Sequence, residues 1–395
     1  MRSSIKTLCI AGKNEIAVFA LDSLRQRYPK ARVICVKNNN DFGYDTWQPS
    51  LRKFAKKNNI PILTLQECYE IEDLIFISLE FDKIIKPHLF SSDQLFNIHF
   101  SKLPAYKGMY TSSLPLLFGE VESGVTLHRI DQGIDTGEII DQTVFPISDI
   151  KSARELYFAY LQQSKKLFEK NIDALMTRSF NSSPQSAIGS SYYSTSFINF
   201  EDLKINLKET ALQVINQIRA FNFREYQLPV VLGYHIHSAE ITTNISTVKE
   251  ASIVSDDLEK IIVSTIDYDV ILRKDKISRL YRLCELDEAD QAKKIVADIS
   301  TLNIHNSKGW TPLIVASYNG SSELISILLK NGASVNSPNY KGTTPLMYAM
   351  SHYEKTGNSL PFDILMQHGA DPEQSDLNGK TLRDYMVERN VKGFF

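Results

Sequence analysis

The first 150 residues alternate between short apolar runs and longer amphipathic stretches. Apolar runs of strand length cover 5–11, 32–36, 74–79 and 94–99, and helical patterns cover 14–27 and 50–57. Strands and helices that alternate in this order build a mostly parallel, doubly wound sheet. We therefore predict a Rossmann-like α/β core in this part of the chain.

A long predicted helix follows this core, and the residue pattern after it changes. The segment SARELYFAYLQQSKKLFEKNIDALM opens with Ser152 and Glu155 at the spacing of a capping box and repeats apolar residues at helical intervals. A Ser-rich stretch, SFNSSPQSAIGSS, separates it from short alternating segments such as PVVLGYHIHSAEI. We predict a first domain over 1–185 and a small β-rich domain over 186–275.

The last third of the chain contains an internal repeat. The segment GWTPLIVASYNGSSELISILLKNGASVNSPNYK begins at Gly309, and GTTPLMYAM begins at Gly342, 33 residues later. A third start, GKTLRDYM at Gly379, comes 37 residues further on, which indicates a short insertion near YEKTGNSLP. A 33-residue period with TPL at a helix start is that of ankyrin repeats. We predict an α-helical ankyrin repeat domain over 276–395, capped by its upstream helices.

Composition excludes several classes of function. The 44 basic residues nearly balance 46 acidic ones, giving a net charge of -2, so the chain lacks the basic surplus of a nucleic-acid binder. No apolar run approaches a membrane span, and Lys13, Asn14 and Glu15 interrupt the N-terminal apolar patch too early for a signal peptide. The four cysteines are far apart and form no CxxC pair. We expect a cytoplasmic globular protein with no nucleic-acid or membrane partner.

The segment FNIHFSKLPAYKG places Asn97 and His99 two residues apart on an apolar strand, so both side chains share one face. Two structural hydrogen-bonding groups and a catalytic edge both fit this pattern. Downstream, GVTLHRIDQGIDTGEII carries Asp131 and Asp135 in a turn between two strands. Taken alone, the turn favours aspartates bonded to their own backbone, and His128 is interpreted as packing on a sheet face.

Together these two segments resemble the formyltransferases that use 10-formyltetrahydrofolate. Asn-x-His, Leu-Pro-x-x-x-Gly, the GVT strand and the Asp-Thr-Gly turn occur in the family's order, with Lys102 where an apolar residue is usual. The resemblance implies a catalytic triad of Asn97, His99 and Asp135. Asn97 and His99 would donate hydrogen bonds to the developing oxyanion, and Asp135 would orient the imidazole, which also moves a proton.

The same resemblance implies that 10-formyltetrahydrofolate is the formyl donor and that no metal is needed. The loop LEFDKIIKPHLF occupies the position where the family builds its folate pocket, mainly from backbone groups. We name Phe81, Ile84 and Ile85 as neighbours of the pterin. Asp131 is either a further neighbour of the pterin or a structural turn residue.

Three acceptors compete: an aminoacyl-tRNA, a small phosphorylated amine and a nucleotide-linked amino sugar. The neutral charge balance argues against tRNA. The stretch IRAFNFREYQLPVVLG offers aromatic faces for a base and arginines for a pyrophosphate, and it resembles sugar N-formyltransferases that act on dTDP-amino sugars. The predicted substrate contacts are Lys13, Asn14, Met109, Tyr110, Arg219, Phe221, Phe223 and Tyr226. Asn14 is also placed as the N-cap of the first helix.

The plan of three domains resembles the subset of these enzymes that act on dTDP-3-amino-3,6-dideoxyhexoses, which implies a homodimer and a role in O-antigen synthesis. The expected substrate is dTDP-3-amino-3,6-dideoxy-D-glucose. The alternatives are dTDP-4-amino-4,6-dideoxyglucose, a UDP-linked sugar, and an ankyrin adapter with a vestigial formyltransferase domain.

One residue of the repeats departs from the pattern. Trp310 stands before TPL, where the other repeats carry Thr343 and Lys380. An exposed tryptophan is frequently a binding anchor. Trp310 either packs against a neighbouring domain or subunit, or belongs to a second site for a protein or a nucleotide base.

Overall fold

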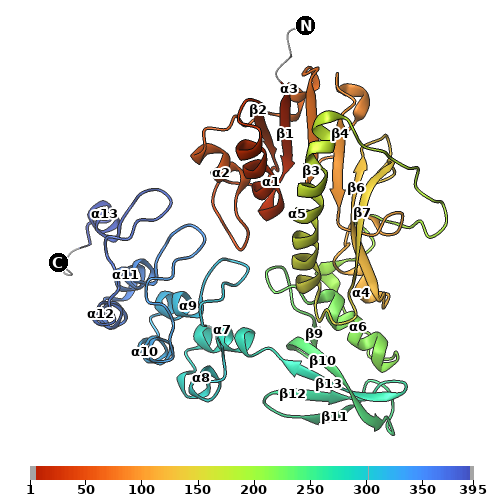
Figure 1. Cartoon of the computed structure of the whole chain (residues 1–395). Coiled ribbons are helices and arrows are strands. Elements are labelled where there is room, and N and C mark those ends of the chain that lie inside the picture. The colour runs from red at the N-terminus through yellow and green to blue at the C-terminus, as the bar shows by residue number, and fades with distance from the viewer. Residues whose placement is uncertain (1–5, 301, 392–395) are drawn as a thin grey trace.

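A six-stranded sheet forms the centre of the N-terminal part of the computed structural model, which describes residues 6–300 and 302–391 (Figure 1). The strand order is β2-β1-β3-β4-β6-β7. The strands are β1 (Thr7–Gly12), β2 (Arg32–Lys37), β3 (Leu74–Leu79), β4 (Leu95–His99), β6 (Glu122–Arg129) and β7 (Ile139–Pro146). Strands β1 to β4 pair in parallel, and β6 and β7 add an antiparallel edge. The predicted α/β core is confirmed.

Helices pack on this sheet because their apolar faces complete its core. They are α1 (Asn14–Arg27), α2 (Leu51–Lys57), α3 (Leu65–Tyr69), α4 (Leu114–Leu117) and α5 (Ala153–Thr177), with a 3-10 turn at Pro87–Leu89. The longest, α5, lies across the sheet (Figure 1) and contributes fully buried Leu156 and Tyr160 to the largest apolar cluster. Its start is as predicted, since the Ser152 side chain accepts a hydrogen bond from the Glu155 N–H.

The segment after α5 stays on the first sheet. Its short strand β8 (Tyr192–Tyr193) pairs in parallel with β5 (Lys107–Gly108), and Ile198 is buried in the first apolar cluster beside the 3-10 turn Phe200–Asp202. The predicted boundary after residue 185 therefore falls within a segment that packs against the first sheet, and the domain limits remain a prediction.

A second, antiparallel sheet of five strands follows in the order β11-β12-β13-β10-β9. Its strands are β9 (Val230–Val231), β10 (Tyr234–Ile245), β11 (Ile253–Asp256), β12 (Lys260–Val263) and β13 (Tyr268–Lys274). The amphipathic helix α6 (Ala211–Phe221) packs on it, and buried Val214 and Ile218 share a cluster with Val263, Val270 and Leu272. This is the predicted β-rich unit.

The C-terminal part consists of helices stacked in pairs (Figure 1). They are α7 (Lys276–Leu286), α8 (Ala289–Val296), α9 (Pro312–Asn319), α10 (Ser322–Lys330), α11 (Pro345–Thr356), α12 (Leu360–Gln367) and α13 (Leu382–Glu388). Thr311 and Thr344 cap α9 and α11 with their side chains, and a proline follows each, as a TPL helix start requires. Helix α11 has 12 residues where α9 has 8, which accommodates the inserted residues of this repeat.

A buried ion pair ties the repeats to the rest of the protein. Asp275 caps α7 through the Ser278 N–H, and both of its oxygens accept from the guanidinium of Arg224. The four cysteines are buried free thiols. Across the described ranges, every helix is too short or too polar to cross a membrane.

Candidate active site

The two polar residues of β4 lie opposite a histidine of β6. Asn97 and His128 are direct partners in the antiparallel register, and Asn97 Nδ2 is 3.1 Å from His128 Nε2. His128 Nδ1 donates to the main-chain oxygen of Arg129 at 2.7 Å, which leaves Nε2 as the acceptor for Asn97. His128 is buried on the sheet face and, besides packing there, hydrogen-bonds to the amide of Asn97. Only strand register reveals this partner, because 31 residues separate it from Asn97.

Asp135 completes the group from the turn between β6 and β7. Its Oδ1 accepts from Asn97 Nδ2 at 3.2 Å, and its Oδ2 accepts from the Gly108 N–H at 2.9 Å. The imidazoles of His99 and His128 face the carboxylate at 3.5 Å each. The structure thus brings Asn97, His99 and Asp135 together, as the resemblance implies.

The orientation of His99 depends on a backbone carbonyl more than on Asp135. His99 Nε2 donates to the main-chain oxygen of Tyr106 at 2.8 Å, because that oxygen can only accept. His99 Nδ1 then faces Asp135 Oδ2 at 3.5 Å, which is long for a hydrogen bond. Sequence reasoning missed Tyr106 because its side chain has no part in this contact.

The charge of the site is concentrated on Asp135. Burial would raise the pKa of this carboxyl, but the facing His99 and His128 and the Gly108 N–H favour the charged form and lower its pKa well below the ordinary value. Asp135 is therefore a carboxylate at neutral pH.

The residues assigned to the pterin fall into three environments. Phe81 and Ile130 pack on the cluster that buries Ile85, so the loop after β3 and the start of the turn lie side by side. Ile84 is exposed. Asp131 accepts hydrogen bonds from the Gly133 N–H and the Thr136 hydroxyl, so it holds the turn together, as its structural alternative describes.

At the carboxyl ends of β1 and β3, the side chains of Asn14 and Glu80 meet. Lys13, not Asn14, occupies the N-cap position of α1, and Asn14, the first residue of the helix, has a left-handed φ of 64°. Asn14 Nδ2 donates to Glu80 Oε2 at 3.0 Å, and the Tyr157 hydroxyl donates to Glu80 Oε1 at 2.9 Å. Burial raises the pKa of Glu80 to about 7, against the opposing effects of Lys13 and these two donors.

An aromatic cluster adjoins this acidic group. Trp47 makes ring contacts with Tyr157, Phe223 and Tyr226, with centroids 5.4 to 5.7 Å apart. Phe223 is buried within the cluster, whereas Tyr226 is exposed. Sequence reasoning proposed Phe223 and Tyr226 but missed Trp47, Tyr157 and Glu80, which lie far from them in the chain.

Arg219 and Phe221 are not part of an open site. The Arg219 guanidinium donates to the main-chain oxygen of Ile150 at 2.7 and 2.9 Å, and Phe221 is buried in the first core. Arg224 is committed to Asp275. The pyrophosphate contacts predicted for these arginines are corrected accordingly, because backbone carbonyls and a carboxylate occupy both guanidinium groups.

The loop after the catalytic strand presents the remaining predicted contacts. Met109 is exposed, and Tyr110 has a φ of 62° and donates its hydroxyl to the main-chain oxygen of Thr195 at 2.5 Å.

Trp310 is half-buried in the repeats. It makes ring contacts with Tyr318 and Tyr348 at 5.3 and 4.8 Å. It also lines a cavity of about 460 Å³ shared with Trp47 and Glu225 of the preceding parts of the chain.

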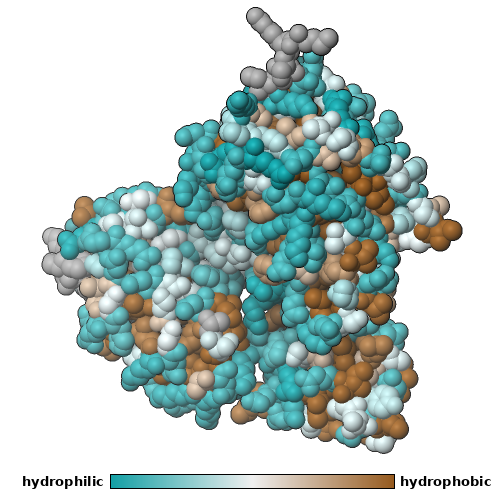
Figure 2. All heavy atoms as spheres, viewed as in Figure 1, coloured by the Kyte–Doolittle hydropathy of each residue, from teal (hydrophilic) through white to brown (hydrophobic). Residues whose placement is uncertain are grey.

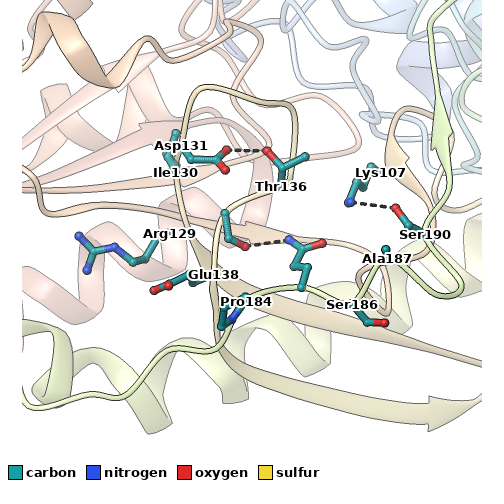
Figure 3. Close-up of a pocket in the computed structure, with 12 residues that line it drawn as sticks. Lys107, Arg129, Ile130, Asp131, Thr136, Glu138, Pro184, Ser186, Ala187 and Ser190 are labelled. Atoms are coloured by element: carbon teal, nitrogen blue, oxygen red, sulfur yellow. Dashed lines mark hydrogen bonds between the residues drawn. The ribbon is translucent and has the colours of Figure 1, made fainter.

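A second cavity, of about 620 Å³, lies behind the catalytic turn. The residues labelled in Figure 3 come from the turn, from Lys107 and from the segment after α5. Lys107 is buried and donates to the Ser190 hydroxyl at 3.0 Å.

Two family models and a curated relative match parts of this chain. The formyl transferase family model matches residues 73–172, and a model of three ankyrin repeats matches residues 280–376. The methionyl-tRNA formyltransferase of Legionella pneumophila strain Corby is 25% identical over 283 residues, which cover 68% of this chain and 90% of that protein.

Two solved structures are more similar. WlaRD, a sugar 3N-formyltransferase crystallised with dTDP and 5-N-formyltetrahydrofolate, is 47% identical, with a TM-score of 0.64 over 69% of this chain and 98% of its own. The N-formyltransferase of Helicobacter canadensis, in complex with folinic acid and dTDP-3-aminofucose, is 46% identical, with a TM-score of 0.64 over 69% of this chain and 100% of its own.

Proposed function

Because the chain belongs to the sugar N-formyltransferases, we propose that it transfers a formyl group from 10-formyltetrahydrofolate to the amine of a dTDP-linked 3-amino-3,6-dideoxyhexose. The observation that carries this proposal is the meeting of Asn97, His99 and Asp135 in a chain 47% identical to a sugar 3N-formyltransferase. Within this class, dTDP-3-amino-3,6-dideoxy-D-glucose remains the predicted acceptor, and the cytoplasm and O-antigen synthesis remain its predicted setting.

The side chains of the site have separate roles in this reaction. The donor supplies an electrophilic formyl carbonyl. His99 accepts the proton released by the attacking amine at Nδ1, and the carboxylate of Asp135 stabilises the resulting imidazolium. The imidazolium then returns this proton to the folate nitrogen as the bond between that nitrogen and the formyl carbon breaks, so tetrahydrofolate leaves neutral. Asn97 provides amide N–H groups that reorient from Asp135 and His128 toward the developing oxyanion.

The residues around the turn fit the formyl donor. Phe81 and Ile85 share an apolar cluster with Ile130, while Ile84 leaves an apolar side chain accessible on the same loop. Such a surface suits a flat pterin ring, and the adjacent backbone groups of the turn supply hydrogen-bond partners.

The acceptor is assigned to the carboxyl ends of β1 and β3, where open sheets of this type bind ligands. Lys13 supplies a cation for the pyrophosphate, and the exposed ring of Tyr226 offers a face to the base. Asn14 and Phe223 line the same region, and Met109 and Tyr110 flank the sugar beside His99.

The test is formyl transfer by the purified protein, followed by mass spectrometry. Acceptors are the gluco and galacto epimers of the dTDP-3-amino sugar, dTDP-4-amino-4,6-dideoxyglucose, a UDP-amino sugar and methionyl-tRNA. We expect one formyl group on a dTDP-3-amino sugar, abolished by His99→Ala and retained by His368→Ala, which removes an exposed histidine of the repeats. Transfer to the 4-amino sugar instead would refute the 3-amino assignment, and no transfer would favour the adapter alternative.

Trp310 favours a second binding function in the repeats. Its ring, with Tyr340 and Tyr348, lines a cavity of the size of a small ligand. We propose that this cavity takes a nucleotide base or a protein side chain. Saturation curves for the sugar and light scattering of a Trp310→Ala variant test this, because an unchanged curve and an unchanged oligomeric state would remove both roles.

The small sheet is the proposed dimer surface. Figure 2 shows apolar side chains gathered over this part of the molecule, and Ile241, Ile253 and Val254 of β10 and β11 are exposed. Light scattering should give the mass of two chains, and the substitution Ile253→Asp should give that of one.

A further inference from the structure

The segment after α5 crosses both loops of the catalytic site. This strap, residues 182–193, lies in the Ser-rich stretch whose composition predicts only a linker. Ser183 forms a two-way backbone bridge with Ile139 at the start of β7, at 2.8 and 2.9 Å. Two residues later, Gln185 Nε2 donates to the main-chain oxygens of Asp135 and Gly137, each at 2.8 Å. The strap therefore holds the catalytic turn from outside the sheet.

The other end of the strap holds the loop that orients His99. The Ser191 hydroxyl accepts from the Tyr106 N–H at 2.8 Å, and the Ser191 carbonyl accepts from the Lys107 N–H at 2.9 Å. Tyr106 is the residue whose carbonyl receives His99 Nε2, and the following Gly108 N–H binds Asp135. One short segment thus fixes the two loops that face each other across the catalytic group.

Within the turn, Asp131 binds the Gly133 N–H and the Thr136 hydroxyl, and the strap adds support from outside. Asp135 has a left-handed φ of 55°, a conformation that is uncommon outside glycine but that aspartate adopts more readily than most residues. The cavity of about 620 Å³ lies between the turn and the strap, where Thr136 and Glu138 line it opposite Ser186 and Ala187 (Figure 3). Because open space and not packed side chains backs the turn on this side, the two hydrogen bonds of Gln185 provide a hold that packing does not provide there.

The chemistry of Gln185 matches this task. A side-chain amide nitrogen has two hydrogens, and both are used on the two carbonyls of the turn. Its oxygen is buried without a partner among the described residues. A buried unpaired acceptor is unfavourable. The side chain of Gln185 therefore lies where both amide hydrogens are bonded, although its oxygen is not.

We propose that Gln185 is a positioning residue, whose amide clamps the catalytic turn so that the carboxylate of Asp135 faces His99. The clamp rests on the proposed roles of Asp135 and His99 in formyl transfer. Gln185 itself touches neither substrate nor any reacting atom.

The experiment compares Gln185→Glu with Gln185→Ala in the full-length protein. Glutamate keeps the shape of glutamine but replaces its two donors with a carboxylate oxygen that repels both carbonyls. We expect both variants to lose kcat by roughly 10- to 100-fold, as small displacements of catalytic groups do. KM for sugar and donor should stay near the wild-type values. Ser186→Ala is the matched control, because its hydroxyl only accepts from the Ile188 N–H within the strap.

Two further measurements separate positioning from stability and from the choice of acceptor. Hydrogen exchange of peptides spanning 130–138 should accelerate in Gln185→Glu while the melting temperature stays unchanged. Wild-type kcat with unchanged exchange in Gln185→Glu would overturn the clamp, and a general loss of stability would overturn it by making Gln185 a fold residue. If the proposed acceptor is wrong, the wild-type protein itself will fail to formylate it. Hydrogen exchange needs no acceptor, so it still tests the role of Gln185.

Discussion

Glu80 gives the sharpest thermodynamic prediction, because its environment changes its proton affinity. The carboxyl group is enclosed between Asn14 and Tyr157, and burial raises its pKa from 4.5 to about 7. The folded protein therefore keeps a proton on Glu80 in a pH range where the unfolded chain has released it. By linkage, the stability of the wild type decreases as pH rises from about 4.5 to 7 and is level above that range.

The replacement Glu80→Gln removes this titration while keeping the shape of the side chain. A pKa difference of 7 against 4.5 corresponds to about 3 kcal/mol of unfolding free energy, at about 1.4 kcal/mol for each pH unit. The free energy of unfolding of Glu80→Gln, relative to the wild type, should therefore rise by up to this amount between pH 4.5 and 7. Below this range, the difference between the two proteins should be constant.

Urea denaturation at pH values from 4 to 8.5 measures this difference. Glu70→Gln is the matched control, since Glu70 is an exposed residue at the end of α3, and its difference from the wild type should not depend on pH in this way. A Glu80→Gln difference that is the same at every pH would refute the reasoning, because the carboxyl group would then titrate alike in both states.

Two further predictions concern the reaction, and a third concerns stability. Asp135→Asn should lower kcat by roughly 10³- to 10⁴-fold, because the imidazolium at 3.5 Å loses an interaction of about 5 kcal/mol at an effective dielectric constant of about 20, and pre-steady-state formyl transfer measures the change. Lys13→Ala should raise the KM for the dTDP-sugar by about tenfold with kcat retained, as the loss of one charge-assisted hydrogen bond predicts, and an unchanged KM would remove Lys13 from the site. Arg224→Ala should lower the melting temperature, because it leaves the carboxylate of Asp275 buried without its cation, and calorimetry tests it against Arg383→Ala, an exposed arginine of the repeats.

The sequence predicts best what periodic patterns and motifs encode. Parallel strands, the small β-rich unit and the 33-residue repeat follow from local spacing and from side-chain burial. The placement of Asn97 and His99 follows from the same period of two. Asp135 needed the resemblance to a family, since a turn aspartate alone is ambiguous.

The residues that sequence reasoning missed depend on contacts between distant segments. His128 is found by strand register, Tyr106 by its backbone carbonyl and Gln185 by the path of an irregular segment. None of these signals is a local pattern, and a Ser-rich composition predicts a linker whether or not the segment crosses an active site.

The stretch from Phe221 to Tyr226 shows why a motif does not assign each of its members. It leaves helix α6, so Phe221 still faces the first core, while Phe223 and Tyr226 turn toward Trp47. Arg224, between them, points to Asp275 at the start of the repeats. Adjacent residues thus serve a core, an aromatic cluster and a connection between two parts of the chain. Because Arg224 and Tyr226 are two residues apart, the ion pair that anchors the repeats also limits where the ring of Tyr226 lies, so the repeat array and the aromatic cluster around Trp47 share one short piece of backbone.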